Sequence, residues 1–243
     1  MTIASKAIAA TALLAFAVPA AAQTVRMGTE GAYPPYNLIN DDGEVDGFER
    51  ELGDKLCELA GLECTWVTNE WDSIIPNLVS GNYDTIIAGM SITDERDEVI
   101  DFTQPYFPPD PSAYVAMAGA GEDVKDGVVA AQTNTIQSAH VASSGATLVE
   151  FANPEETVAA VRNGEVDAVI ADKAFLSPIV EQSNGELEFI GEDVVLGDGI
   201  GVGLRESDAE LKEKLDAAIT QVKEDGTLNE LIVKWFGPDA QTF

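Results

Sequence analysis

The sequence predicts an α/β protein with two similar lobes, and three features of the chain support this prediction. Residues 85–88 form a short apolar run that leads through a turn into a helix start, a pattern typical of a buried strand. The order helix, glycine, acidic turn and buried strand occurs at 78–89 and again at 161–172. Prolines at 107–111 and glycines at 197–203 interrupt regular structure where the chain would cross between the lobes.

The first 22 residues have the composition of a secretory signal peptide. Lys6 provides a positive charge, residues 7–17 are apolar, and small residues precede an expected cleavage near Ala22. The apolar stretch is too short to span a bilayer, which argues against the alternative of a permanent membrane anchor. We therefore expect residues 1–22 to be a signal peptide and the rest of the chain to be exported.

The expected mature chain is strongly acidic. The sequence holds 13 basic and 43 acidic side chains, and losing Lys6 with the signal peptide takes the net charge from −30 to −31. Such a surface keeps a protein soluble and attracts cations. It repels phosphate backbones, so nucleic acid is excluded as a partner.

The two cysteines are predicted to form a structural disulfide. Apolar residues recur at helical spacing over 48–60, and Gly61 would end that helix, which places Cys57 on its last turns. Cys64 opens the next expected strand, and an exported protein meets oxidising conditions. A redox or metal role is disfavoured because the spacing is not Cys-x-x-Cys and His140 is the only histidine.

Residues 40–47 resemble a calcium-binding loop in part. Counted from Asp42, acidic residues fall at the first, third and fifth positions and a glycine at the sixth, but the twelfth position is Gly53 instead of glutamate. An acidic hairpin is the better interpretation. We predict no metal and no cofactor for this chain.

A candidate ligand site lies beyond the expected strand at 85–88. Gly89, Ser91 and Arg96 follow that strand, and Thr93 stands where a helix N-cap belongs. In open α/β sheets, ligands bind at the carboxyl ends of strands. A planar guanidinium beside a hydroxyl group suits a carboxylate. The alternative is that Arg96 pairs only with its acidic neighbours on a solvated face.

The second copy of the repeat ends in Asp172 where the first ends in Gly89. If the strand ends of two similar lobes face one another, Asp172 lies across a cleft from Arg96. An amino acid zwitterion requires an anion and a cation in such an arrangement. The two repeats therefore predict a site for an amino acid between the lobes.

Two further residues have alternative interpretations. Thr135 follows an expected strand at 128–131 and begins a helix, which is the geometry of an anion-binding group of amides, but plain N-capping explains it equally. Trp71 stands at a helix start and is either a core aromatic or a platform on which a ligand stacks.

Several segments together resemble a known family, and they lie at 29–36, at Cys57 and Cys64, at 71–76, at 88–96 and at 201–205. The chain resembles the polar amino-acid-binding proteins of bacterial ABC importers, solute-binding protein family 3, over its whole mature length. Within that family it is most similar to arginine and lysine/arginine/ornithine/histidine binders and to opine binders.

The resemblance implies the two-lobe, type II periplasmic binding protein fold. Each lobe would be a mixed β-sheet flanked by helices, and two hinge strands would join the lobes. Lobe 1 would comprise residues 23–108 plus 203–243, and lobe 2 residues 109–202 including the hinge crossovers.

The resemblance also assigns roles at the α-carbon end of a bound amino acid. Arg96 would grip the α-carboxylate with the help of Ser91 and Thr135. Asp172 would take the α-ammonium together with the carbonyl group of Gly89.

Four residues would surround the ligand side chain. By resemblance, Tyr33 and Trp71 would sandwich it and Glu30 would lie at the end of the pocket. Ala88 replaces a hydroxyl residue of some basic amino-acid binders, which weakens the prediction of lysine or ornithine selectivity. Aromatic rings with one carboxylate favour a guanidinium or an ammonium group.

The expected function is a monomeric periplasmic receptor that binds a polar, basic L-amino acid, with arginine favoured, and delivers it to an ABC permease in the inner membrane. A glutamine or opine binder is the alternative within the same fold. A periplasmic cyclohexadienyl or prephenate dehydratase is the enzymatic alternative, against which the ammonium-pairing Asp172 argues. A sensor that presents its ligand to a receptor kinase is not separated from transport by the sequence.

Overall fold

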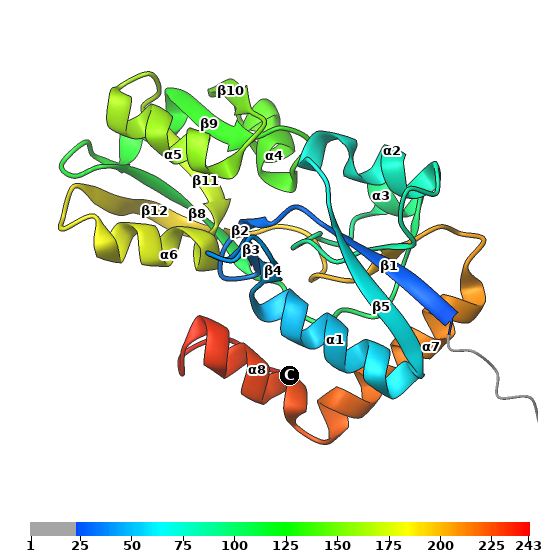
Figure 1. Cartoon of the computed structure of the whole chain (residues 1–243). Helices are drawn as coiled ribbons and strands as arrows, with labels where there is room; N and C mark the ends of the chain where they lie inside the picture. Colours follow the sequence, from blue (N-terminus) through cyan, green and yellow to red (C-terminus); the bar gives the residue numbers. More distant parts are fainter. Residues whose placement is uncertain (1–22) are drawn as a thin grey trace, which may run out of the picture.

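The protein is described by a computed structural model over residues 23–243, and the expected signal peptide lies outside the described residues. The chain forms two α/β lobes, each with its own five-stranded sheet (Figure 1). We call the lobe that contains the first strand lobe 1 and the other lobe 2. Within residues 23–243, no helix is both long enough and apolar enough to cross a membrane.

The sheet of lobe 1 combines strands from both ends of the chain. Its members are β1 (Gln23–Thr29), β5 (Leu62–Thr68), β6 (Thr85–Ile86), β7 (Asp101–Phe102) and β13 (Gly203–Leu204). The spatial order is β5-β1-β6-β13-β7, in which β1 is parallel to β5 and β6 and β13 is antiparallel to β6 and β7. Lobe 1 is therefore a mixed sheet, and a late segment of the chain completes it.

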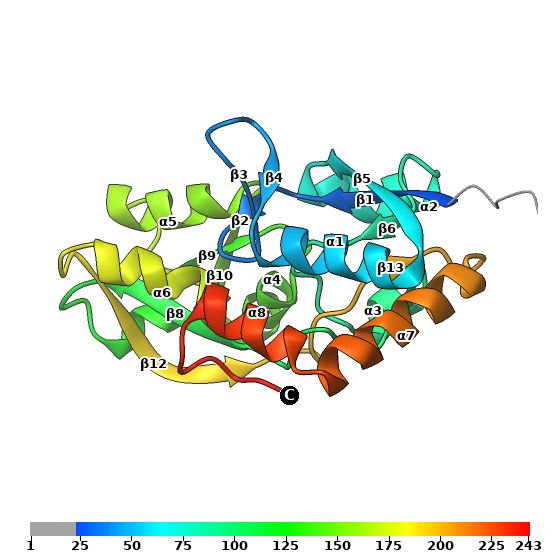
Figure 2. The ribbon, with the colours of Figure 1, turned by 60° about the horizontal axis from the view of Figure 1, so that its bottom comes forward.

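Two helices of lobe 1 follow β13, near the end of the chain. The helical segments of lobe 1 are α1 (Phe48–Ala60), the 3₁₀ turn η1 (Trp71–Ser73), α2 (Ile74–Val79), α3 (Asp94–Asp97), α7 (Ala209–Glu224) and α8 (Thr227–Phe236). Both α7 and α8 contact α1 (Figure 2). The helix α1 buries Phe48, Leu52 and Leu56, and Gly61 ends it in the left-handed conformation that the sequence predicts.

Lobe 2 has a mixed sheet of its own. Its strands are β8 (Pro111–Met117), β9 (Val128–Gln132), β10 (Thr147–Phe151), β11 (Ala168–Asp172) and β12 (Leu187–Val195), in the order β10-β9-β11-β8-β12. The three strands β9, β10 and β11 are parallel, and β8 is antiparallel to β11 and β12. Its helical segments are η2 (Glu122–Asp126), α4 (Ile136–Ser144), α5 (Pro154–Asn163) and α6 (Lys173–Gln182).

The predicted internal repeat is confirmed in structure. The helices α2 and α5 are each followed by a left-handed glycine, Gly81 with φ of 79° and Gly164 with φ of 71°, and then by the central strands β6 and β11. All residues of both strands are buried, as expected for strands covered on both faces. The two lobes thus present the same local unit to each other.

Two segments cross between the lobes side by side. Tyr106 donates its backbone N–H to the carbonyl of Ile200 at 2.8 Å, and Ile200 donates to the carbonyl of Phe107 at 3.0 Å. The Phe107 ring packs against Tyr36 and Phe236 of lobe 1, with ring centroids 5.3 and 4.7 Å away. The crossovers are therefore paired with each other and anchored to lobe 1.

A small three-stranded sheet lies beside the cleft-facing edge of lobe 1. It consists of β2 (Ala32–Tyr33), β3 (Asn37–Ile39) and β4 (Val45–Asp46), all antiparallel. The acidic segment between β3 and β4 is a hairpin, as the sequence predicts. Among the described residues, no three His, Cys, Asp or Glu side chains are grouped so that they could hold a metal ion.

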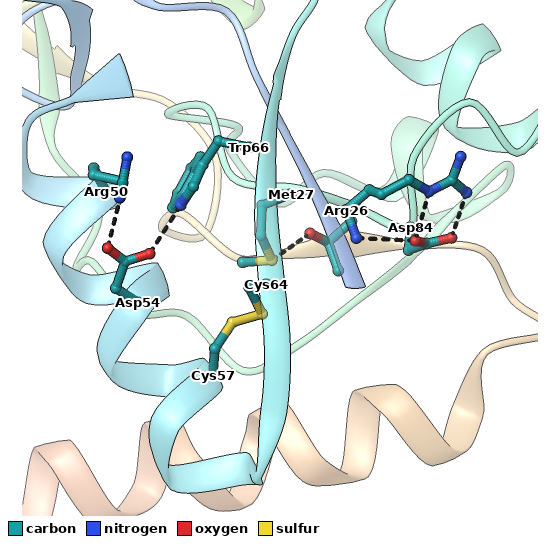
Figure 3. Close-up of a disulfide and its surroundings, with 9 residues drawn as sticks. Arg26, Met27, Arg50, Asp54, Cys57, Cys64, Trp66 and Asp84 are labelled. Atoms are coloured by element: carbon teal, nitrogen blue, oxygen red, sulfur yellow. Dashed lines mark hydrogen bonds and ion pairs between the residues drawn. A yellow bond between two sulfur atoms is a disulfide. The ribbon is translucent and has the colours of Figure 1, made fainter. Parts of the chain in front are cut away.

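Cys57 and Cys64 form the predicted disulfide, which joins the end of α1 to β5 (Figure 3). The same two elements are linked about one helical turn away by Asp54. Its carboxylate accepts from Trp66 Nε1 at 2.9 Å and from Arg50 Nε at 2.7 Å. The disulfide therefore closes a short loop within one lobe, away from the contact between lobes.

Replacing both Cys57 and Cys64 by serine is expected to lower the free energy of unfolding by about 2.5 kcal/mol, because an eight-residue loop is released in the unfolded chain. Urea unfolding of the variant, compared with the wild type with and without reductant, checks this. The reduced wild type should match the variant. A wild type whose stability does not respond to reductant would contradict the expectation.

Candidate functional site

The candidate site is a cavity between the two lobes. Its empty volume, the part open to solvent included, is about 320 Å³. The lining residues are Glu30, Tyr33, Trp71, Ala88, Gly89, Ser91, Arg96, Gln132, Thr135, Ile136, Gln137 and Asp172. The structure thus brings together all nine residues that the sequence and the resemblance single out.

Arg96 is held over the cavity by its own lobe and by the other one. Thr93 caps α3 and accepts the backbone N–H of Arg96 at 3.2 Å, which fixes the start of the helix. The guanidinium donates from Nη1 to the carbonyl of Ser91 at 2.8 Å and from Nη2 to that of Asn134 in lobe 2 at 3.1 Å. Over residues 23–243 it forms no ion pair, so the alternative in which Arg96 pairs with its acidic neighbours is wrong.

The electrostatics of Arg96 favour an anionic partner. Burial lowers the pKa of its guanidinium to about 10, although Asp172 and Glu95 act in the opposite direction. A guanidinium that is bonded only to carbonyl groups retains a strong attraction for a carboxylate, which it can bind with two parallel hydrogen bonds. Arg96 is therefore suited to bind an anion that enters the cavity.

Trp71 is a core aromatic of lobe 1 that also lines the cavity. Its ring is 7% exposed and belongs to the core of lobe 1 with Ile74, Leu78 and Met90. The other side of the ring faces the cavity, where the Arg96 guanidinium lies 5.4 Å from the ring centroid. The tryptophan thus connects the cavity wall rigidly to the core.

Asp172 ends β11 and faces the cavity from lobe 2. Its side chain accepts a hydrogen bond from the Tyr33 hydroxyl at 2.8 Å and another from Gln137 Nε2 at 3.0 Å. Burial raises the pKa of this carboxyl to about 7, and the nearby Asp110 contributes to the rise, while Tyr33, Arg96 and Gln137 oppose it. A carboxyl in this state gains stabilisation when a cation approaches.

Tyr33 links the lobes through the same carboxyl group. Its ring stacks on Phe175 of α6, with centroids 4.4 Å apart and an angle of 9° between the planes. Its hydroxyl oxygen also accepts the backbone N–H of Asp172 at 3.1 Å. Tyr33 therefore packs against lobe 2 while it lines the cavity.

Glu30 follows β1 and lines the cavity beside Gln132. Gln132, the last residue of β9, donates from Nε2 to Glu30 Oε1 at 2.7 Å, which makes a second link between lobes. Burial raises the pKa of the Glu30 carboxyl to about 7, and the negative charges of Glu70, Asp72 and Glu49 add to the effect while the Gln132 bond opposes it. This end of the cavity therefore favours a cation.

Thr135 has the capping role that the sequence left open. It is the N-cap of α4 in a reciprocal box with Ser138, whose backbone N–H donates to Thr135 Oγ1 at 3.1 Å. The Thr135 hydroxyl in turn donates to the carbonyl of Gln132 at 2.7 Å. The hydroxyl proton of Thr135 is therefore already used within lobe 2. What Thr135 places at the cavity is the N-terminal end of α4.

Three lining residues were missed by sequence reasoning: Gln132, Ile136 and Gln137. Gln132 stands at the carboxyl end of a buried strand, as Asp172 does. Ligands bind at such strand ends, so this position indicates a cavity residue. Ile136 and Gln137 lie in the first turn of α4, where the local sequence does not separate a cavity wall from a protein surface.

Comparison with known proteins agrees with this architecture. The profile of the family "Bacterial extracellular solute-binding proteins, family 3" matches residues 25–238. The chain belongs to this family. It is 32% identical to the L-arginine-binding protein of Pseudomonas aeruginosa, over 96% of each chain.

Two solved structures of family members are similar over nearly the whole described chain. A periplasmic His/Glu/Gln/Arg/opine family-binding protein from Silicibacter pomeroyi, in complex with lysine, is 73% identical and has a TM-score of 0.88, covering 90% of this chain and 100% of that one. An ancestral arginine-binding protein bound to glutamine is 33% identical with a TM-score of 0.82, covering 90% and 100%. The predicted two-lobe, type II fold of this family is confirmed.

Replacing Asp172 by asparagine is expected to stabilise the ligand-free protein above pH 7 and to leave its stability almost unchanged below pH 4. The pKa of this carboxyl rises from 3.8 to about 7 on folding, so its neutral form is favoured in the fold and the associated stability is lost as the pH rises between these values. Melting temperatures from pH 4 to pH 8.5 test this. A variant whose advantage does not grow with pH would contradict it.

Proposed function

We propose that this protein is a receptor for a basic L-amino acid, with arginine favoured and lysine included. The observation that carries the proposal is the charge pattern of the cavity, which is lined by one guanidinium, Arg96, and by two carboxyl groups, the buried Asp172 and the partly buried Glu30. An amino acid with a cationic side chain has the complementary pattern of one carboxylate and two cations. Each ligand group would meet a partner of opposite charge in a site shielded from water.

In this proposal Arg96 binds the α-carboxylate, with Ser91 and the start of α4 at Thr135 beside it. Asp172 and the carbonyl of Gly89 receive the α-ammonium. The side chain extends along Tyr33, Trp71 and Ala88 to Glu30. The Tyr33 ring is in addition stacked on Phe175, and its hydroxyl donates to Asp172.

The comparisons support arginine and lysine ahead of glutamine. The lysine complex of the 73% identical relative favours lysine as a second ligand, in spite of Ala88. The glutamine complex of the ancestral protein keeps glutamine as the alternative. An ionised Glu30 prefers a cation, whereas a protonated Glu30 suits a neutral amide, so the charge of this one carboxyl decides between the two classes of ligand.

The ligand would act by favouring the closed arrangement of the lobes. We propose that lobe 1 (residues 23–108 and 203–243) and lobe 2 (109–202 with the crossovers) move as two bodies about the paired crossovers. Each lobe holds half of the charged groups, so a ligand gains its full interaction energy only when the lobes are together. Membership of the family supports an exported protein, with 1–22 as its signal peptide, that passes its ligand to an ABC permease. We further propose that the protein acts as a monomer.

We propose binding without turnover. The lone histidine, His140, lies outside the cavity, with its ring centroid 6.4 Å from that of Tyr114 on lobe 2. The acidic groups within the cavity are explained by the ligand's cations. Incubation of the purified protein with prephenate tests the enzymatic alternative, and release of an aromatic product would overturn the proposal.

Calorimetric titration of the refolded, ligand-free protein is expected to show tight binding of L-arginine, weaker binding of L-lysine and weak or no binding of L-glutamine. Arg96→Ala and Asp172→Ala should each weaken arginine binding by at least about a hundred-fold, because each leaves a buried ligand charge without its partner. Arg162→Ala, which removes a partly exposed arginine paired with Glu186, is the matched control and should bind like the wild type. Wild-type affinity in the first two variants would refute the assigned site.

Arginine affinity is expected to fall as the pH is lowered from 8 to 5.5, with a slope that approaches about a hundred-fold per pH unit well below 7, because one proton at Glu30 and one at Asp172 compete with the ligand. Glu30→Gln should reduce both this pH dependence and the preference for arginine over glutamine. Titrations of both amino acids at several pH values measure the effect. A variant that retains the wild-type preference would remove Glu30 from the ligand site.

A further inference from the structure

Glu49 is a fully buried carboxylate outside the cavity lining. It lies in the first turn of α1, is 0% exposed, and has no ion-pair partner within residues 23–243. Its oxygens accept three hydrogen bonds from neutral groups. Gly89 N donates at 2.6 Å, Asn37 Nδ2 donates at 2.8 Å, and the hydroxyl of Tyr106 also donates.

The three donors come from three different segments that bear on the ligand site. Gly89 lines the cavity directly. Asn37 uses its other side-chain atom, Oδ1, to accept the backbone N–H of Gly31 at 2.7 Å, and Gly31 follows Glu30. Tyr106 belongs to the first crossover, where its backbone bonds to Ile200. One carboxylate therefore joins both ends of the cavity to the connection between the lobes.

The direction of these hydrogen bonds requires an acceptor at both oxygens of Glu49. The Gly89 amide can only donate, and the Asn37 amide is oriented by its acceptance of the Gly31 N–H, so its NH₂ group faces Glu49. A neutral amide at position 49 would place an NH₂ group against one of these donors. Burying an unsatisfied donor in this way costs more than the loss of an ordinary hydrogen bond.

Gly89 shows why such a constraint matters for the site. Its φ is +62°, in the left-handed region, and a Cβ added there would lie 3.5 Å from the Tyr33 ring. A glycine is free to leave this conformation at little cost, since it has many alternatives. The bond from Gly89 N to Glu49 selects one of them and so fixes how the backbone after β6 faces the cavity.

We propose that Glu49 is the positioning residue of the ligand site, a buried acceptor that holds the Gly89 backbone and, through Asn37, the Gly31 backbone beside Glu30 in the arrangement that receives the amino acid. It acts through these groups and does not touch the ligand. The predicted effect of Glu49 on ligand affinity rests on the proposed function. Its predicted effect on the backbone amides of Gly89 and Gly31 does not.

The test compares Glu49→Gln with a double variant in which the hydrogen bond between residues 49 and 37 runs in the opposite direction. In Glu49→Gln, exchange of the Gly89 and Gly31 amide hydrogens in the ligand-free protein should accelerate, and arginine affinity should fall, each by on the order of ten-fold. In the double variant Glu49→Gln/Asn37→Asp, the glutamine NH₂ donates to an aspartate that still accepts Gly31 N–H. Both quantities should return to within about three-fold of the wild type.

Matched measurements separate positioning from a general loss of stability. Glu58→Gln, on the exposed side of the same helix, should change neither amide exchange nor affinity. A purely structural role would lower the melting temperature of Glu49→Gln without lowering the affinity of the folded protein. Should Glu49→Gln fail to fold, Asn37→Ala replaces it, since it removes one donor without adding another and should accelerate exchange at Gly31.

The outcomes distinguish this inference from the proposed function. If the wild type binds no basic amino acid, the proposed function fails, while the amide exchange of the ligand-free variants still decides the role of Glu49. Unchanged exchange at Gly89 and Gly31 in Glu49→Gln, or no recovery in the double variant, overturns the inference.

Discussion

The carboxyl ends of two buried central strands, β6 and β11, meet at one cavity, and most features of the molecule depend on this opposition. β6 leads to Gly89 and Arg96, and β11 ends at Asp172. Strand ends place backbone amides and charged side chains where a ligand can reach them. Because the guanidinium and the carboxyl group come from different lobes, neither charge finds its counterpart within its own lobe. The electrostatic state of the site is thereby tied to the distance between the lobes.

The cavity holds acidic groups that are bonded to neutral partners, with Asp172 buried and Glu30 partly buried. Glu30 is bonded to Gln132, and Asp172 to Tyr33 and Gln137, and burial raises the pKa of both carboxyl groups to about 7. This arrangement is unfavourable for the protein alone and becomes favourable when a cation is present. The bonds that link the lobes, Gln132 to Glu30 and Tyr33 to Asp172, thus use carboxyl groups that bind a cation more favourably than a neutral donor. Weak links of this kind allow a receptor to open when no ligand is bound and to close when one is.

Local patterns allowed much of the fold and part of the site to be predicted from the sequence. Thr93 caps a helix, Gly81 and Gly164 end the repeated units, and Cys57 and Cys64 form a disulfide, because each of these roles is decided by a few neighbouring residues. These cues and the family resemblance indicate nine of the twelve residues that line the cavity.

Tertiary contacts decided what the sequence left open. Three acidic neighbours made an exposed ion pair a reasonable interpretation of Arg96, and only Asn134 of the other lobe shows where its guanidinium points. Trp71 has two faces, so one ring serves core and cavity together. Gln137 and Glu49 gave no local signal, because a polar residue in the first turn of a helix is normally solvated and its burial depends on elements far away in the chain.

The strand order of lobe 1 also has a consequence for the timing of folding. β13, made of Gly203 and Leu204, lies between β6 and β7, whose residues precede it by about half the chain. The sheet of lobe 1 therefore stays open at its middle until the last quarter of the polypeptide has been synthesised, whereas lobe 2 needs only one continuous segment. Contacts between such distant segments form slowly because a long loop must first be closed. The topology itself delays completion of the first lobe until most of the chain is available to fold.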